Sequence, residues 1–461
     1  MLSKEVVENT IEAALSTGGD FAEIFAENTS KNSISMVNGK VDKVLSGIDY
    51  GVGIRIFDGT NAVYVYTNDT SEKSLIEIAK KGAKAVKNKK QPIKIFNFDK
   101  QEFSNKNKIK VYPYQVAKKD IVEILKTASN EALEYNNLIK QTSTGCADIA
   151  QNVFIANSKG LWVQDERVRT RFSFEAIASN ESEKQSGRFS PGGQIGYELF
   201  EKINVKEIAR ESARIAITML NAKPCPSDKM TVVIDNGFGG VIFHEACGHS
   251  LEATAVAKGA SVFCNKLGEK IASEVVTAID DGTIQNGWGS GNIDDEGTPT
   301  QRNILIENGI LKSYLIDTLN GMKMGMKSTG SSRRESYRYA PTSRMSNTFI
   351  AAGKSTPEEI ISQTEYGLYA KQMGGGSVDP ATGVFNFAVL EGYIIRNGKI
   401  CEPVRGATLI GKGSQVLLDI DMVGNNLLRA QGMCGSISGS IPADVGQPMI
   451  RVRNITVGGR G

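Results

Sequence analysis

Histidine is scarce in this sequence, since it occurs only twice in 461 residues. The six cysteines form neither a CxxC pair nor the close spacing of a small disulfide framework. No apolar run approaches the roughly 20 residues that cross a bilayer, and the start of the chain lacks the charged and apolar regions of a signal peptide. We therefore expect a protein with reduced thiols, without membrane spans and located in the cytoplasm.

A strong excess of one charge is also lacking, because the formal net charge is only +3. Charge is nevertheless uneven: between Lys80 and Lys110 lysine dominates, and the only acidic residues there are Asp99 and Glu102. The phenylalanines of this stretch form no RNA-binding signature. We interpret the stretch as a solvated helix end and connecting loop, and we do not expect nucleic-acid binding.

Both histidines lie in one hexapeptide, His244-Glu245-Ala246-Cys247-Gly248-His249. Neutral imidazole is the commonest metal ligand in proteins. A glutamate directly after the first histidine is typical of the helical zinc motif, where it acts as a general base. The hexapeptide therefore indicates metal binding by His244 and His249.

The spacing of the two histidines differs from the usual zinc motif, because it is i, i+5 and not i, i+4. On a regular α-helix, five residues separate two side chains by about 140°, whereas four separate them by only about 40°. A straight helix cannot easily aim both rings at one ion. We predict a bulged or broken helix, with Gly248 at the irregularity.

A catalytic zinc ion needs a third protein ligand, and the sequence offers several candidates. Glu252 follows His249 by one helical turn, Cys247 lies inside the hexapeptide, and Asp280 and Asp281 begin a turn-like segment. Cys434 lies far downstream between glycines that free the backbone to present a thiolate. From chemistry alone, Cys434 and Glu252 are nearly tied.

In addition to the hexapeptide, several short motifs occur in a specific order along the chain. They are Gly51-Val52-Gly53-Ile54-Arg55, Gln185-Ser186-Gly187, Gly192-Gly193, Asp294-Asp295-Glu296-Gly297-Thr298-Pro299, Arg333-Arg334-Glu335-Ser336-Tyr337, Arg344-Met345-Ser346-Asn347-Thr348, Gly374-Gly375-Gly376-Ser377-Val378-Asp379-Pro380, Val445-Gly446-Gln447-Pro448 and Val457-Gly458-Gly459. With the His-Glu-x-x-x-His segment, this order resembles the TldD/PmbA family of zinc metallopeptidases over most of the chain.

The resemblance implies one zinc ion held by His244, His249 and Cys434, with Glu245 as the catalytic base. It also implies that unfolded or extended peptides are cleaved in an enclosed cleft. The family pairs an active TldD-type subunit with a PmbA/TldE-type paralogue that lacks the metal motif. Since this chain retains the motif, it resembles the active type, and we expect a dimer with such a paralogue or with itself.

A polar cluster in the C-terminal half could hold a peptide's carbonyls or terminal carboxylate. Its members are Arg333, Arg334, Tyr337, Arg344 and Asn347. The competing interpretation is structural pairing with nearby carboxylates. A rival function is a non-catalytic, zinc-stabilised regulatory or assembly subunit, since the family is associated in name with modulation of DNA gyrase. The retained Glu245 favours an enzyme, because a structural zinc site needs no general base.

The hydrophobic periodicity predicts an α+β protein in three units, 1–110, 111–223 and 224–461. Helices are expected at 4–16, 72–86, 119–135 and 205–220, with strands between them. Asn-Gly pairs at 38–39, 308–309 and 397–398 predict hairpin turns. The first two units are predicted to be α+β, and the third a largely antiparallel, barrel-like sheet that carries the metal-binding helix.

Overall fold

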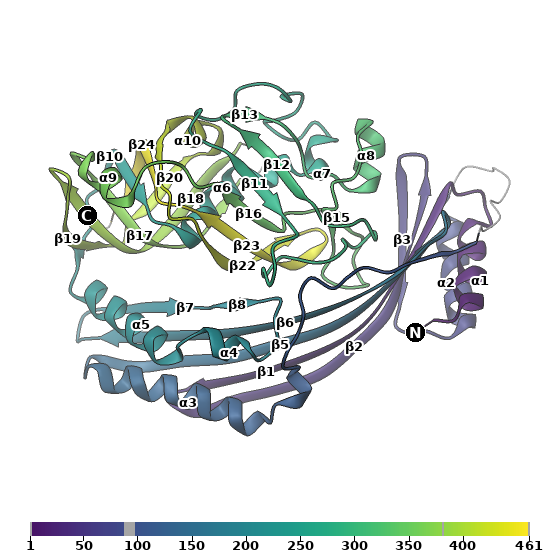
Figure 1. The fold of residues 1–461 in the computed structure, drawn as a ribbon, viewed down its shortest axis with the longest axis horizontal. Coiled ribbons are helices and arrows are strands. Elements are labelled where there is room, and N and C mark those ends of the chain that lie inside the picture. The colour runs from purple at the N-terminus through teal and green to yellow at the C-terminus, as the bar shows by residue number, and fades with distance from the viewer. Residues whose placement is uncertain (1, 87–96, 380–381, 460–461) are drawn as a thin grey trace.

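A long curved sheet and a C-terminal body that lies over it make up the molecule (Figure 1). This computed structural model describes residues 2–86, 97–379 and 382–459. The expected α+β class, with a barrel-like C-terminal unit, is confirmed. Part of the lysine-rich stretch, residues 87–96, lies outside the described residues, while its described lysines are exposed.

The long sheet has the strand order β3-β2-β1-β5-β6-β4, and β7 and β8 also pair with β6. Its strands are β1 (Phe21–Val37), β2 (Lys40–Asp58), β3 (Asn61–Thr67), β4 (Asp99–Gln101), β5 (Ile139–Asn157), β6 (Leu161–Ser179), β7 (Lys184–Phe189) and β8 (Gly192–Gly193). Asn38 and Gly39 have φ of 49° and 72°, so they form the predicted turn between β1 and β2. Because β1 pairs with β5 over 15 residues, the first two predicted units share one continuous sheet. The boundaries at 110 and 223 stay predictions.

Helices cover the long sheet near its two ends (Figure 1). At one end, α1 (Lys4–Leu15) and α2 (Glu72–Ala83) bury apolar side chains against β1, β2 and β5. At the other end, α3 (Lys118–Tyr135) and α5 (Val205–Leu220) pack against β1, β5 and β6, beside the short α4 (Leu199–Lys202). Helices α1, α2, α3 and α5 match the expected ones to within three residues at their ends, whereas α4 was not expected.

A closed ring of five strands forms one half of the C-terminal body, in the order β17-β10-β24-β20-β18 with β18 returning to β17. The β10–β17 pair is parallel and the other four pairs are antiparallel. The ring strands are β10 (Asp228–Ile234), β17 (Tyr366–Val378), β18 (Val384–Arg396), β20 (Thr408–Lys412) and β24 (Ile450–Gly458). Around them lie α9 (Pro357–Ser362), α10 (Gly413–Asp419), β9 (Lys223–Pro224), β19 (Lys399–Arg405) and β21 (Ile420–Val423).

The other half of the C-terminal body is a six-stranded sheet in the order β13-β12-β11-β16-β23-β22. Its strands are β11 (Ala278–Asp281), β12 (Arg302–Glu307), β13 (Ile310–Leu311), β16 (Asn347–Ile350), β22 (Leu428–Ser436) and β23 (Gly439–Gln447). Beside it lie α8 (Thr318–Met324) and the pair β14 (Ser332–Arg333) and β15 (Thr342–Ser343). The predicted hairpin at Asn308-Gly309 is confirmed between β12 and β13, and that at Asn397-Gly398 between β18 and β19.

Buried ion pairs join the long sheet to the C-terminal body. Arg55 of β2 contacts Glu23 at 3.0 Å and Glu296 of the body at 2.6 Å. Arg167 of β6 contacts Asp295 of the body at 2.6 Å. All five side chains are at least nine-tenths buried, so the pairs hold the body in one place over the sheet. None of the described helices combines the length and apolarity needed to cross a bilayer.

Candidate metal centre

The metal-binding hexapeptide follows a glycine-rich turn at the end of β10. Strand β10 leads through the 3₁₀ turn η2 (Gly237–Gly240) into the short helix α6 (Val241–Ala246). A Cβ atom on Gly240 would overlap the backbone of Gly446 in β23. The glycine therefore lets the start of α6 lie directly against the six-stranded sheet.

The predicted break in the helix is confirmed. Helix α6 ends at Ala246, and a separate 3₁₀ turn, η3 (Gly248–Leu251), carries His249. The interruption falls on Cys247, whose φ and ψ are −131° and −47°, one residue before the predicted position. Gly248 serves packing there, since a Cβ atom on it would overlap Sδ of Met345. The break turns the two imidazole rings toward each other, with centroids 5.2 Å apart.

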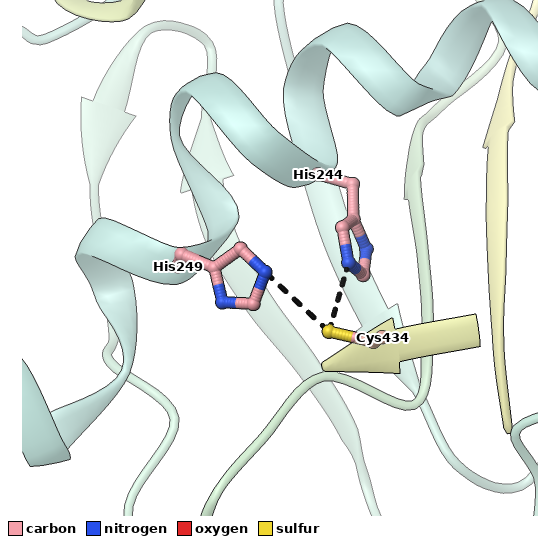
Figure 2. A group of neighbouring side chains, drawn as sticks. All are labelled: His244, His249 and Cys434. Carbon is pink, nitrogen blue, oxygen red and sulfur yellow. Dashed lines mark hydrogen bonds between the residues drawn. The ribbon is translucent and has the colours of Figure 1, made fainter. Parts of the chain in front are cut away.

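Cys434 on edge strand β22 completes the group (Figure 2). Its Sγ lies 3.2 Å from Nε2 of His244 and 3.4 Å from Nε2 of His249. The ligand atoms of the three residues all lie within 4.8 Å of one another. The fold thus brings together the two histidines and the distant cysteine.

The electrostatics of this group favour a metal-binding form of the sulfur. Burial alone would raise the pKa of the Cys434 thiol, but the charge of His244 and hydrogen bonds with both rings lower it to about 3. Burial lowers the pKa of His249, yet Glu252 and Cys434 together raise it well above its usual value. Cys434 is therefore a thiolate at neutral pH, the form of cysteine that binds metals.

Glu252, the rival third ligand, lies behind His249 and not beside the sulfur. Its carboxylate is 3.3 Å from Nδ1 of His249, which leaves Nε2 to face Cys434. The fully buried Arg344 donates to the carbonyl of Cys434, and its Nε lies 3.8 Å from Glu252. His244 differs from His249, because its buried Nδ1 has no hydrogen-bond partner among the described residues.

Glu245 lines a cavity of about 180 Å³ together with His244 and Cys434. Its side chain is 26% exposed, and its carboxylate lies 3.7 Å from Nε2 of His249. The cavity walls also include Gly375 and Gly376 of β17 and Gly432 and Met433 of β22. Glu245 is therefore an acid that a bound molecule in this cavity can reach.

The other ligand candidates are engaged elsewhere. Cys247 is fully buried in the apolar core, and burial raises the pKa of its thiol. Asp280 accepts hydrogen bonds from Ser346 and Thr348, and Asp281 accepts them from Thr283. These residues fit structural roles.

The predicted polar cluster does not gather at one place. Arg334 reaches away to the long sheet, where it contacts Glu23 at 3.0 Å, and Tyr337 packs against Phe25 in the same junction. Asn347 bonds to the backbone of Asp281 and Gly289. Arg344 alone of these borders the candidate centre, through the backbone of Cys434. Their predicted role in substrate binding stays a prediction.

Two features of the site were not recognised from the sequence. The contact of Glu252 with His249 has a signal in the sequence, the i, i+3 spacing, but the same spacing also suits a metal ligand. The wall formed by Gly375 and Gly376 has a signal only in the run of three glycines, whose place beside the hexapeptide depends on the closed ring.

The donor set fits a zinc ion. Zinc lies about 2.3 Å from sulfur and about 2.0–2.1 Å from imidazole nitrogen, so tetrahedral ligands place S and N roughly 3.6 Å apart. The two S–N distances of 3.2 and 3.4 Å come within roughly 0.2–0.4 Å of that value. Three protein ligands are also the number typical of catalytic zinc sites, which keep one position open.

Fold and site together define a protein with a candidate metal centre built from a His-Glu-x-x-x-His segment and a distant cysteine. The chain matches the PmbA/TldA metallopeptidase domain 1 over residues 22–88, the central domain over 111–220 and the C-terminal domain over 227–459. A relative from Buchnera aphidicola subsp. Acyrthosiphon pisum, named a metalloprotease TldD homolog, is 36% identical, with 95% of this chain and 93% of the relative covered. The chain therefore belongs to the PmbA/TldD family.

Two solved structures share the fold. A Thermotoga maritima protein described as a candidate modulator of a DNA gyrase superposes with a TM-score of 0.82 at 21% identity, covering 99% of this chain and 100% of that one. TldE from Thermococcus kodakarensis superposes with a TM-score of 0.77 at 20% identity, covering 98% and 99%. At these identities the similarity concerns the fold alone.

Proposed function

We propose that this chain is a zinc-dependent peptidase that hydrolyses peptide bonds of unfolded or extended peptides. The observation that carries the proposal is the meeting of His244, His249 and Cys434 with Glu245 at one cavity. Two imidazoles and a thiolate are a soft donor set that suits zinc. When bound, zinc supplies a Lewis acid that polarises the scissile carbonyl and lowers the pKa of a water molecule.

The chain's own residues supply the proton transfers. Glu245 is exposed enough to take a proton from the attacking water and to pass it to the departing amine. Glu252 and Arg344 hold His249 and the backbone of Cys434 in place, so the ligands need little rearrangement. Position supports these proposed roles, since Glu245 lines the cavity, whereas Glu252 is 5% exposed.

The shape of the cavity supports an extended peptide as substrate. Strand β22 is the edge of its sheet, so a peptide can lie beside it as a further strand. A Cβ atom on Gly375 or Gly435 would meet nothing within 4 Å, which leaves open backbone on both sides of the site. A folded protein presents no free strand to such an edge, and we therefore propose selection by unfoldedness in an enclosed cleft.

Cleavage of an unstructured fluorogenic peptide by the purified, zinc-loaded chain tests the proposal. Glu245→Gln should lower kcat by at least about a hundredfold, because general-base catalysis contributes about 10²–10⁴-fold. A chelator should abolish the activity of the wild-type chain. Glu358→Gln, an exposed position in α9, is the matched control and should leave the rate unchanged.

Each outcome separates the peptidase from its rival. If Glu245→Gln cleaves as fast as the wild type, the proposed mechanism is wrong. If elemental analysis finds one zinc per chain but no unstructured peptide is cleaved, the non-catalytic, zinc-stabilised regulatory or assembly subunit is the better proposal. Chains that contain no metal after expression with added zinc would contradict both.

We also propose that the chain works as a dimer, with a second copy of itself or with a TldE-type paralogue. The N-terminal half of β2 supports this, because β3 pairs only with residues 52–58 and leaves residues 40–50 at the sheet edge. Val41, Val44, Leu45 and Ile48 are exposed there, Leu45 at 61% and Ile48 at 71%. An exposed apolar edge strand is a template for pairing with another chain.

A further inference from the structure

A small cavity lies at the junction of β6 with the C-terminal body, apart from the residues of the proposed zinc site. Its volume is about 20 Å³. Arg167 and Arg169 of β6 form one wall, and Arg333, Asp294 and Asp295 contribute to the other. The cavity is therefore enclosed by charged groups from both bodies of the molecule.

The carboxylates around this cavity are already bonded to other groups. Asp295 accepts hydrogen bonds from Arg167 and from the backbone N–H of Arg334, each at 2.6 Å. Asp294 accepts three backbone N–H groups at 2.9–3.0 Å, those of Glu296, Thr298 and Ser332. Neither carboxylate neutralises the remaining two arginines by direct contact.

Among the described residues, the hydrogen-bond partners of Arg169 and Arg333 are backbone carbonyl oxygens. Arg169, which is 6% exposed, donates to Trp288 at 2.9 Å and to Ser290 at 3.0 Å. Arg333 donates to Met345 at 2.6 Å. Within the described part of the chain, neither forms an ion pair with a carboxylate. A guanidinium carries five N–H donors, which is more than these bonds use, so both side chains have donor capacity left for a ligand in the cavity.

The charges of these two arginines are only partly compensated. Burial is the largest cause that lowers the pKa of Arg169 to about 9 and that of Arg333 to about 10. Neighbouring guanidinium groups lower both values further, and the charge of Asp295 offsets part of this in each case. Arg167 differs, because Asp295 and Asp165 outweigh its burial and raise its pKa. Arginine stays charged at neutral pH, so the lowered values mark positive charge that the nearby carboxylates only partly offset.

We propose that this cavity binds a monatomic anion, chloride, between Arg169 and Arg333. The volume exceeds the roughly 10–15 Å³ that one water molecule needs, so it suits a ligand of atomic size. The anion accepts hydrogen bonds from guanidinium N–H groups and offsets the charges of Arg169 and Arg333. Since Arg169 belongs to the long sheet and Arg333 to the C-terminal body, the anion stabilises their junction.

The anion site is linked to both segments that carry the proposed zinc ligands. Arg333 holds the carbonyl of Met345, whose Sδ packs on Gly248 beside His249. Arg169 holds the carbonyl of Trp288, whose indole N–H donates to Gly432, two residues before Cys434. Loss of the anion should therefore loosen the junction between the long sheet and the C-terminal body before it affects the rest of the molecule.

Thermal unfolding of the full chain in sodium chloride, sodium bromide and sodium gluconate at equal ionic strength tests the proposal. The midpoint should rise and then saturate with chloride and bromide, because a ligand that binds only the folded state stabilises it by mass action. Gluconate is too large for the cavity and should give no saturable rise. Equal curves in chloride and gluconate would overturn the proposal and indicate that water fills the cavity.

Two variants locate the effect. Arg169→Gln should lose the difference between chloride and gluconate, whereas Arg171→Gln, two residues along β6 and bonded to Ser190 and Gln431, should keep it. If Arg169→Gln fails to fold, a crystal of the wild-type chain grown in bromide decides. An anomalous peak within hydrogen-bonding distance of both guanidinium groups is expected, and its absence would contradict the proposal.

Discussion

At the scale of single residues, the candidate centre depends on what lies behind each ligand. His249 is oriented by Glu252, whereas Nδ1 of His244 is buried without a partner among the described residues. The two histidines are equivalent in the sequence pattern but not in their surroundings. The second contact of each ring therefore decides how firmly it is held.

We predict that Glu252→Ala weakens zinc binding about 10–100-fold, because His249 then loses the acceptor that fixes its tautomer. Competition with a fluorescent chelator measures the affinity. Glu269→Gln, which changes an exposed partner of Lys266, is the control and should bind zinc like the wild type. An unchanged affinity in Glu252→Ala would show that His249 needs no such support.

A second residue, Asp444, makes stability depend on pH. It is 2% exposed, and burial raises the pKa of its carboxyl to about 6 despite Arg429. Between the usual value of 3.8 and about 6, the folded chain holds more protons than the unfolded chain. Stability from this group is therefore present at low pH and is lost as the pH rises through that window.

Asp444→Asn should remove this contribution. From pH 4 to pH 7, the free energy of unfolding of the wild type should fall relative to that of Asp444→Asn by about 2 kcal/mol, since one pKa unit corresponds to about 1.4 kcal/mol and part of the shift lies below pH 4. Urea unfolding at a series of pH values measures the difference. Parallel curves for the two proteins would mean that Asp444 is ionised in the folded chain throughout.

At the scale of elements, the junction of α6 and η3 shows what the spacing of two residues can and cannot predict. The i, i+5 spacing of His244 and His249 predicts that the helix is not straight, and the break at Cys247 agrees with that. The place of Cys434 does not follow from any spacing, because β22 reaches the site through pairing with β23. Resemblance, not periodicity, favoured it over Glu252.

The polar cluster shows the same limit of what the sequence can predict. Arg334, Tyr337 and Arg344 lie within eleven residues, yet the first two point to the long sheet and the third to Cys434. Residue type predicted that they would be engaged, but direction depends on how β14 and β15 turn between the two bodies. The strands and hairpins were predictable because they follow from local pattern and Asn-Gly turns.

We predict that Gly248→Ala destabilises the chain by about 1–3 kcal/mol, because the added methyl group overlaps Sδ of Met345 in a packed core. Urea unfolding measures the loss. Gly435→Ala, where a Cβ atom meets nothing within 4 Å, is the control. Combined with Met345→Ala, the two changes should cost less than their sum, and strict additivity would show that the contact does not limit this turn.

At the scale of the whole molecule, the β2 side of the long sheet has a covered part and an uncovered part. Near α1 and α2 the edge of β2 is covered by β3, whereas residues 40–50 of β2 carry exposed apolar side chains. Natural proteins seldom leave such an edge uncovered. The proposed dimer would cover it.

Ile48→Lys should therefore convert a dimer of this chain to a monomer at micromolar concentration, because it places a charge on the exposed edge. Light scattering gives the mass. Val384→Lys, a change at another exposed apolar residue, on β18, is the control and should leave the mass unaltered. A wild-type chain that is monomeric alone would instead favour a paralogue as partner.

The ion pairs between the sheet and the C-terminal body also constrain the order in which the chain can mature during synthesis. Arg55 emerges from the ribosome 241 residues before Glu296, the carboxylate that it contacts in the finished protein. Until that segment arrives, Arg55 has only Glu23 of its two carboxylate partners, and its guanidinium stays accessible to water. The strands of the sheet can pair early, but the face that the C-terminal body covers stays exposed to water until that body is made. Newly made N-terminal halves are therefore the species that need protection from aggregation.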